Sequence, residues 1–281
     1  MSDRKAPVKP RAGSGGSKRP GAQLLGGDRC LFTVWAPKSK TVEVKLVYPY
    51  EKTVELDPAG AGYFKGVLEN VSVGTRYWYV LDDGEARPDP ASRLQFEGVK
   101  GPSVVVNNEF DWQDRYWCGL PLEDYVFYEL HVGAFTQEGT LDAARGRLNE
   151  LKELGITAVE LMPLAEFPGG RNWGYDGVFP YSVHHAYGGP AGLKRFVNAA
   201  HQLGLAVVLD VVYNHLGKEG ACLDDFAPYY EKKYRTVWGP ALNFDGRDSD
   251  AVKTFFLENA LYWLDECRVD ALRLDAVGAI H

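Results

Sequence analysis

The run Leu205-Ala206-Val207-Val208-Leu209 constrains the fold more than any other feature, because it is apolar throughout. A strand that is covered on both faces, as in parallel sheets, has this composition. Asp210 ends the run, and Asn214 and His215 follow where the strand is expected to finish. Polar groups at the carboxyl ends of strands form the active site of a barrel of alternating strands and helices. The stretch by itself is equally compatible with a buried strand whose Asp is merely hydrogen-bonded.

Strand and helix patterns alternate through the second half of the sequence. Four segments have the composition of strands: residues 125–132, 157–162, 205–211 and 269–275. Three stripes at helical spacing separate them: residues 141–151, 193–203 and 252–263. This order predicts right-handed βαβ units. The long connections, 163–190 and 216–250, follow strands, and active-site loops of an eight-stranded barrel lie in that position.

The predicted fold class is α/β plus all-β. Residues 122–281 are expected to form the first half, about four βα units, of a TIM-type (β/α)8 barrel, because the sequence stops after the fourth predicted strand. Residues 23–108 show short, evenly spaced strand patterns with turn markers between them, which predicts an antiparallel β-sandwich. Residues 109–121 are interpreted as a linker. Residues 1–22, basic and rich in Pro, Gly and Ser, are interpreted as a disordered tail.

Composition excludes several classes of protein. The net charge of −7 argues against nucleic acid as a partner, and no apolar run is long enough to predict a membrane segment. Four cysteines without a CxxC pair, and a first segment without a signal-peptide core, predict a cytoplasmic protein. His184, His185 and His201 lack the spacing of metal ligands, so we predict a surface role for them. No metal site and no cofactor are predicted.

Alternation along the strand at 269–275 places Arg273 and Asp275 on the same side. If the leucines between them face outer helices, these two side chains face the barrel axis near its top. Asp210 is expected to point inward from the neighbouring strand, and His215 follows that strand with donors suited to a sugar hydroxyl. A carboxylate held ionised in a sugar pocket is what a glycosidase nucleophile requires. The alternative is a buried ion pair that only holds the barrel together.

Two segments resemble signatures of the α-amylase superfamily of glycoside hydrolases: Asp210-Val211-Val212-Tyr213-Asn214-His215 and Asp270-Ala271-Leu272-Arg273-Leu274-Asp275. Further segments look most like the malto-oligosyltrehalose trehalohydrolase family: residues 128–133, 160–169 and 172–177. The predicted sandwich, with its Arg87-Pro88-Asp89-Pro90 segment, is similar to the glucan-binding module that precedes the barrel in such enzymes. The resemblance covers about residues 23–281.

The resemblance implies a role for each of five residues. Asp275 is the expected nucleophile of a retaining mechanism, and Arg273 is expected to fix its charge and orientation. His215 is expected to bind a hydroxyl of the sugar at the cleavage point, and Tyr175 to stack on the face of that sugar. Asp210 is expected to support the site from behind. The implied reaction is hydrolysis of the α-1,4 bond beside the terminal trehalose of malto-oligosyltrehalose or a related α-glucan.

The sequence departs from the family pattern in three respects. The general acid, a Glu on the fifth strand, has no counterpart in these 281 residues, and neither has the transition-state-stabilising Asp beyond the seventh strand. Ala271 stands where the superfamily usually has Gly, and Gly278 where trehalohydrolases often have His. We therefore expect this chain to be inactive alone. Two alternatives stay open, a glycogen branching or debranching enzyme and a non-catalytic glucan-binding fragment.

Overall fold

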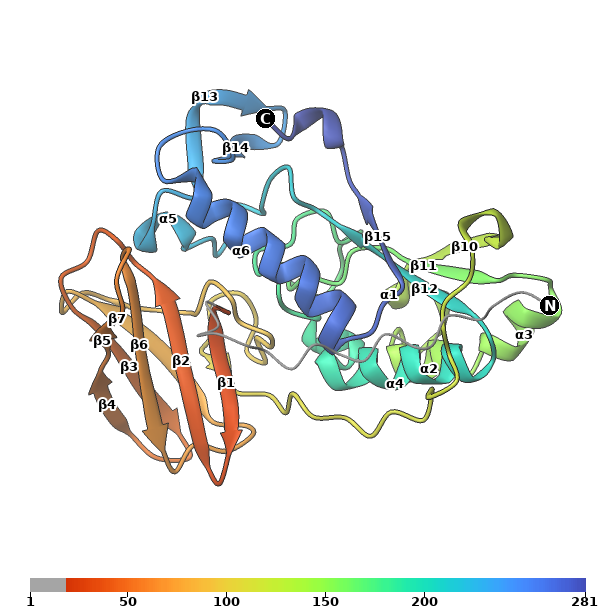
Figure 1. The fold of residues 1–281 in the computed structure, drawn as a ribbon, viewed down its shortest axis with the longest axis horizontal. Helices are drawn as coiled ribbons and strands as arrows, with labels where there is room; N and C mark the ends of the chain where they lie inside the picture. The colour runs from red at the N-terminus through yellow and green to blue at the C-terminus, as the bar shows by residue number, and fades with distance from the viewer. Residues whose placement is uncertain (1–18) are drawn as a thin grey trace.

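Alternation of apolar and polar residues builds two antiparallel sheets at the N-terminal end of the chain (Figure 1). The computed structural model describes residues 19–281. The first sheet has the order β1 (Gly21–Gly26), β2 (Arg29–Trp35), β6 (Tyr63–Glu69), β5 (Asp57–Pro58). The second has the order β4 (Lys52–Glu55), β3 (Val42–Tyr48), β7 (Arg76–Leu81), β8 (Ala86–Arg87), and β9 (Ser103–Val104) also pairs with β7.

The two sheets pack against each other through aromatic side chains. Phe32 on β2 and Tyr77 on β7 meet edge to face, with ring centroids 5.0 Å apart. In β3, Val44 and Leu46 are buried while Lys45 between them is exposed. The inward residues of both sheets therefore share one apolar core, and burial of such side chains is the main term that stabilises the pair of sheets.

The predicted tail, residues 1–22, lies outside the described residues as far as Lys18. Its last two residues are part of β1, where Gly21 pairs with Thr33 and Ala22 with Phe32. Gly21 has a φ of +93°, and a Cβ there would approach the Arg93 guanidinium to 2.5 Å. A glycine is therefore required where the chain enters the sheet. The predicted tail overlaps β1 by two residues, Gly21 and Ala22.

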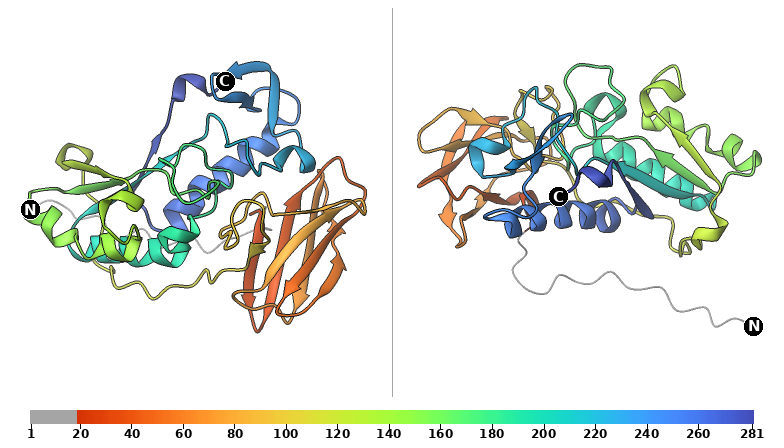
Figure 2. Two further views of the ribbon diagram at one scale, coloured as in Figure 1. Left: turned by 180° about the vertical axis from the view of Figure 1, so that it is seen from behind. Right: turned by 90° about the horizontal axis from the view of Figure 1, so that it is seen from above.

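A parallel sheet forms the second part of the chain, in the order β10 (Phe127–Leu130), β11 (Ala158–Leu161), β12 (Ala206–Val211), β15 (Ala271–Leu274). Each neighbouring pair is in register without a shift. Every residue of β12 is buried, as its apolar run predicts. Within the described residues, β10 and β15 pair on one side only. Figure 2 shows the two antiparallel sheets lying to one side of this part.

The helices lie in the connections between the parallel strands: α1 (Val132–Phe135), α2 (Leu141–Arg145), α3 (Leu148–Glu153), α4 (Gly189–Gln202), α5 (Leu223–Phe226) and α6 (Ser249–Leu261). Single turns complete them: η1 (Leu122–Asp124), η2 (His185–Tyr187), the π-turn η3 (Tyr262–Glu266) and η4 (Val277–Ala279). No helix among residues 19–281 has both the length and the apolar character needed to cross a membrane.

Two connections differ from the sequence prediction. The helical stripe 141–151 is split into α2 and α3, because Gly146 and Arg147 interrupt it and glycine is a poor helix former. The connection 216–250, predicted as a loop, contains α5 and a hairpin of β13 (Tyr230–Thr236) and β14 (Gly239–Leu242). Figure 2 shows this hairpin beside the C-terminal end of the chain, where Tyr234 stacks on His281.

A buried polar cluster fixes residues 109–121 to the parallel sheet. His201 on α4 lies between two carboxylates, with Nδ1 2.7 Å from Asp114 and Nε2 3.0 Å from Asp270. Trp117 stacks on the imidazole and donates to Asp270. Arg268 donates to the second oxygen of Asp114. The predicted surface role of His201 is therefore wrong, because the carboxylates supply the partners that a buried imidazole needs.

Replacing His201 with Ala is expected to destabilise the chain strongly. The substitution removes the imidazole that contacts the buried Asp114 and the half-buried Asp270, and leaving a buried polar group without its partner typically costs about 1–3 kcal/mol. Chemical denaturation followed by circular dichroism measures the free energy of unfolding. Lys253→Ala is the control, since its ion pair with Asp250 is exposed. A loss below about 1 kcal/mol for His201→Ala would contradict a stabilising role for this cluster.

Candidate active site

The in-register pairing of β12 and β15 places Asp210 beside Arg273. One nitrogen of the Arg273 guanidinium, Nη1, donates to Asp210 Oδ2 over 2.8 Å and to Asp275 Oδ1 over 2.8 Å. Arg273 and Asp275 thus lie on one side of the strand, as the alternation of side chains predicts. A single guanidinium group joins two carboxylates from neighbouring strands.

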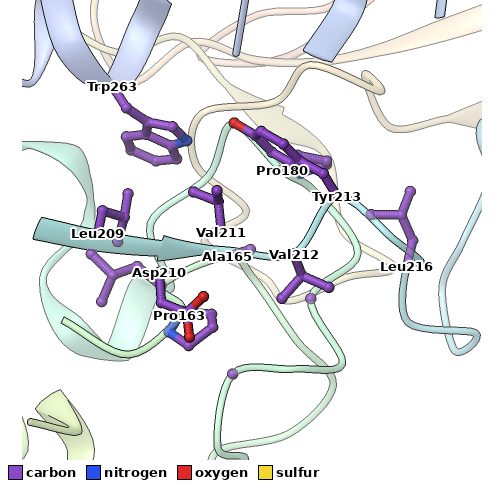
Figure 3. A pocket seen from close by; sticks show the side chains of 13 residues that line it. Pro163, Ala165, Pro180, Leu209, Asp210, Val211, Val212, Tyr213, Leu216 and Trp263 are labelled. Atoms are coloured by element: carbon purple, nitrogen blue, oxygen red, sulfur yellow. The ribbon is translucent and has the colours of Figure 1, made fainter. Parts of the chain in front are cut away.

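Asp210 is almost fully enclosed, with 1% of its surface exposed. Figure 3 shows its side chain on the side of β12 that faces Pro163, while Val211 points toward Trp263 around a small cavity of about 20 Å³. Burial raises the pKa of Asp210 to about 6, against the hydrogen bonds from Arg273 and Tyr175, which lower it. Its Oδ1 atom has no hydrogen-bond partner among the described residues. Only one of the two carboxylate oxygens, Oδ2, is therefore hydrogen-bonded among the described residues.

Asp275 lies one residue beyond β15, and its backbone N–H still continues the ladder to Val211. Its Oδ1 accepts from Arg273, and its Oδ2 accepts from Asn214 Nδ2 over 3.0 Å. The same Asn214 amide donates to the Asp275 carbonyl over 2.8 Å. The side chain of Asp275 remains 16% exposed. Two donors thus fix the orientation of a carboxylate that is still open to the surface.

Tyr175 reaches the group from the connection between β11 and α4. Its hydroxyl donates to Asp210 Oδ2 over 3.0 Å, and its ring is half-buried. Burial raises its pKa, and the negative charge of Asp210 adds to that shift. Gly174, with a φ of +100°, precedes it, and a Cβ there would lie 2.3 Å from the Pro163 carbonyl oxygen. Only glycine allows the chain to approach the Pro163 backbone this closely.

His215 is buried, and its Nδ1 contacts Asn214 Oδ1. Its ring stacks on Trp238 of the β13–β14 turn, with centroids 5.1 Å apart and an interplanar angle of 15°. Burial lowers its pKa. An open pocket of about 520 Å³ adjoins both rings and is also lined by Asn172, Asp176 and Lys218. Polar groups beside an aromatic face are suited to bind a sugar ring.

Two clusters within residues 19–281 have the spacing of metal ligands, Glu166–His184–His185 and Glu129–Glu160–Asp210. In the first, His185 is hydrogen-bonded to the buried Glu166, and His184 Nδ1 accepts from the Ala186 N–H. When the His184 ring is neutral, that bond leaves its proton on Nε2, which lies 3.6 Å from Glu166 Oε1. A ring nitrogen that carries a proton cannot bind a metal, so this cluster is disfavoured as a metal site. The predicted surface role of His184 is wrong, because the residue is buried. Phe167 stacks on its ring, with the ring centroids 4.0 Å apart.

The structure brings all five residues selected from the sequence into one neighbourhood. Asp210, Arg273, Asp275 and Tyr175 are directly hydrogen-bonded, and His215 joins them through Asn214. Sequence reasoning missed two residues. Asn214 stood beside His215 as a polar residue at a strand end, which was a sufficient signal to include it. Trp238 gave no such signal, because only the folded hairpin brings it to His215.

The chain is similar to known proteins over most of its length. The family model described as "Alpha amylase, catalytic domain" matches residues 129–242. A malto-oligosyltrehalose trehalohydrolase of Saccharolobus solfataricus is 50% identical over 256 residues, which are 91% of this chain and 45% of that protein. A 1,4-alpha-glucan branching enzyme of Pseudoalteromonas atlantica is 32% identical over 92% of this chain and 40% of its own.

Solved structures give the same result. A protein of Salmonella typhimurium, provisionally named an α-amylase, superposes with a TM-score of 0.88 and 43% identity, covering 94% of this chain and 45% of its own. A pullulanase of Anoxybacillus in complex with maltotetraose superposes with a TM-score of 0.78 and 25% identity, covering 95% and 46%.

The chain spans about 45% of the length of three trehalohydrolases that it matches. These relatives are 44–50% identical to it over about 90% of its own length. The chain is therefore similar to malto-oligosyltrehalose trehalohydrolases over about 90% of its own length, and its residues 129–242 match the α-amylase catalytic domain.

Proposed function

We propose that this chain supplies the nucleophile side of a retaining trehalohydrolase site, which cleaves the α-1,4 bond beside the terminal trehalose of malto-oligosyltrehalose. The observation that carries the proposal is the Asp275 carboxylate, held by Arg273 and Asn214 and still open to the surface. A retaining mechanism needs two carboxyl groups about 5–5.5 Å apart. The general acid is then contributed by residues outside this sequence.

The four parallel strands are, in this proposal, the first half of a (β/α)8 barrel. Two observations support this assignment: the strands pair without a register shift in the order β10-β11-β12-β15, and helices connect them. The polar residues stand at the carboxyl ends of β12 and β15, where barrel enzymes carry their sites. The two antiparallel sheets, which begin at Gly21, then form the glucan-binding-type module that the sequence predicts over residues 23–108.

Each site residue has a role in binding or cleaving the sugar. Asp275 attacks the anomeric carbon, and Arg273 holds it in place. Asp210 anchors the guanidinium from behind and accepts from the Tyr175 hydroxyl, which fixes the ring that stacks on the sugar. His215 binds a hydroxyl of the same sugar. Trp238, parallel to His215 at the edge of the 520 Å³ pocket, offers a further apolar face to an α-glucan.

A glycogen branching enzyme is the second candidate, because a branching enzyme also matches this chain, at lower identity. The products separate the two reactions. A trehalohydrolase releases trehalose and needs a trehalosyl end, whereas a branching enzyme creates α-1,6 linkages in amylose. A purely glucan-binding role predicts instead that residues 23–108 bind maltoheptaose without the barrel part. Absence of binding at millimolar sugar excludes that role.

The catalytic proposal predicts trehalose release only when this chain is combined with the rest of a barrel. Asp275→Asn in that complex is expected to reduce kcat at least about 10³-fold, because an amide cannot form the glycosyl intermediate. Release of trehalose is measured by chromatography. Asp57→Asn, an exposed residue of β5, is the matched control. Trehalose release by the 281-residue chain alone, or an unchanged rate in Asp275→Asn, would contradict the proposal.

The burial of Asp210 predicts a pH dependence of stability. Its pKa is raised from 3.8 to about 6 in the folded chain. Between about pH 4 and 6 the folded state therefore binds more protons than the unfolded state, so the free energy of unfolding falls as the pH rises and levels off above 6. Asp210→Asn removes this decline, which urea denaturation across the window measures relative to Asp57→Asn. An identical slope in both variants would be inconsistent with it.

A further inference from the structure

One polar side chain interrupts the apolar stripe of α6. Val252, Phe255 and Phe256 are buried on this helix, and Asn259 takes the next position of the stripe with none of its surface exposed. Asparagine is a poor helix former, and burying its amide destabilises the folded state unless the amide is hydrogen-bonded. Asn259 therefore belongs at this position because of its hydrogen-bond partners.

Three hydrogen bonds hold the Asn259 amide. Its Oδ1 accepts from the Tyr213 hydroxyl over 2.5 Å and from Trp263 Nε1 over 3.1 Å. Its Nδ2 donates to the Pro180 carbonyl over 3.0 Å. Because an indole N–H can only donate, the amide oxygen faces Trp263, and the amide nitrogen is thereby directed to Pro180. Figure 3 shows the Tyr213 hydroxyl and the Trp263 indole nitrogen pointing toward each other.

Two of these partners belong to segments that carry side chains of the candidate site. Tyr213 begins the segment that follows β12, residues 213–217, which also carries His215. We call residues 213–217 the β12 segment. Pro180 lies in the connection between β11 and α4, five residues after Tyr175. One amide on a helix is thus bonded to both segments.

A backbone hydrogen bond joins the β12 segment to the same connection a second time. The Gly217 N–H donates to the Gly177 carbonyl over 2.9 Å. A Cβ on Gly217 would lie 2.1 Å from the Asp176 carbonyl oxygen, so the two backbones are in close contact at this point. Asn214 and His215 therefore lie between two fixed points, one at each end of the β12 segment.

The two segments depend on the Asn259 amide to different extents. The connection between β11 and α4 has a second anchor on α6, because the Tyr181 hydroxyl donates to the Phe255 carbonyl over 2.6 Å. The Tyr213 ring meets Phe256 edge to face, with centroids 5.1 Å apart. Apolar packing is non-directional, so the hydrogen bond to Asn259 fixes the direction of the Tyr213 hydroxyl. Loss of the amide is therefore expected to displace the β12 segment more than the connection.

We propose that Asn259 is a positioning residue of the candidate site, whose amide fixes, through Tyr213, the segment that carries His215. Asn214 lies in the same segment and donates to Asp275, so the effect extends to the proposed nucleophile. The inference rests on the proposed function, since it concerns the same site. If Asn259 only stabilised the packing of α6, its loss would lower the stability of the fold without changing the surroundings of His215.

The test uses two variants and a matched control. Tyr213→Phe removes one hydroxyl and keeps the ring, and Asn259→Leu keeps the volume and removes all three hydrogen bonds. If Asn259→Leu does not fold, Tyr213→Phe still decides the test. Tyr77→Phe is the control, because Tyr77 is a buried tyrosine of β7 whose hydroxyl donates to Asp89. NMR follows the His215 imidazole of the chain as the pH is changed, and His215→Gln assigns its signal.

The expected sign of the NMR result follows from the burial of His215. Burial lowers its pKa, against the charges of Asp275 and Asp176, which raise it. A displaced β12 segment exposes the ring to water, so the midpoint of its titration is expected to rise toward 6.5 in Tyr213→Phe. The same change in Tyr77→Phe, far from the site in sequence, is expected to leave the midpoint unchanged.

The second measurement is trehalose release by the complex of this chain with the rest of a barrel. We expect kcat/KM to fall at least about tenfold in Tyr213→Phe, because sugar-binding and nucleophilic groups are displaced, and to stay within about twofold in Tyr77→Phe. An unchanged His215 titration in Tyr213→Phe, or an unchanged kcat/KM in an active complex, overturns the inference. A shifted titration, with no trehalose released by the unsubstituted complex, leaves the inference standing and overturns the proposed function.

Discussion

The hydrogen bond between Arg273 and Asp210 connects every part of the candidate site. Asp210 is buried within β12, and burying a carboxylate without hydrogen-bond partners would destabilise the folded state. The Arg273 guanidinium on the neighbouring strand and the Tyr175 hydroxyl supply its partners. The same guanidinium nitrogen also bonds Asp275. Any displacement of β15 relative to β12 therefore changes the support of Asp210 and the orientation of Asp275 together.

The connection after β11 depends on a second buried carboxylate. Glu166 accepts from the backbone N–H and the imidazole of His185, and its own N–H donates to the Ser182 hydroxyl. Burial raises the pKa of Glu166, against these hydrogen bonds. The start and the end of the connection that carries Tyr175 are thereby tied to each other. A long loop can then present one aromatic ring to Asp210 with little freedom to move away.

Local patterns predicted most of the fold. Apolar alternation located β2, β3, β6 and β7, and the apolar runs located the four parallel strands, because a strand's periodicity depends only on which of its faces are buried. The hairpin β13–β14 was missed, since residues 230–242 lack a strong apolar alternation and are half-exposed. His184 and His201 were misjudged for a related reason. Their burial is made possible by Phe167, Asp114 and Asp270, which are distant in sequence.

The sequence by itself determined which side chains share a face of a strand, and so it grouped Arg273 with Asp275 on one strand and Asp210 on the neighbouring strand. It also determined the family resemblance, because the signature segments are short and contiguous. Only the tertiary structure decided that one guanidinium nitrogen bonds two carboxylates, that Asn214 orients Asp275, and that Trp238 covers His215. Those contacts depend on how strands and loops that are distant in sequence are placed relative to one another. Strand register and close packing fix this placement, and a pattern of residue types within one segment does not specify it.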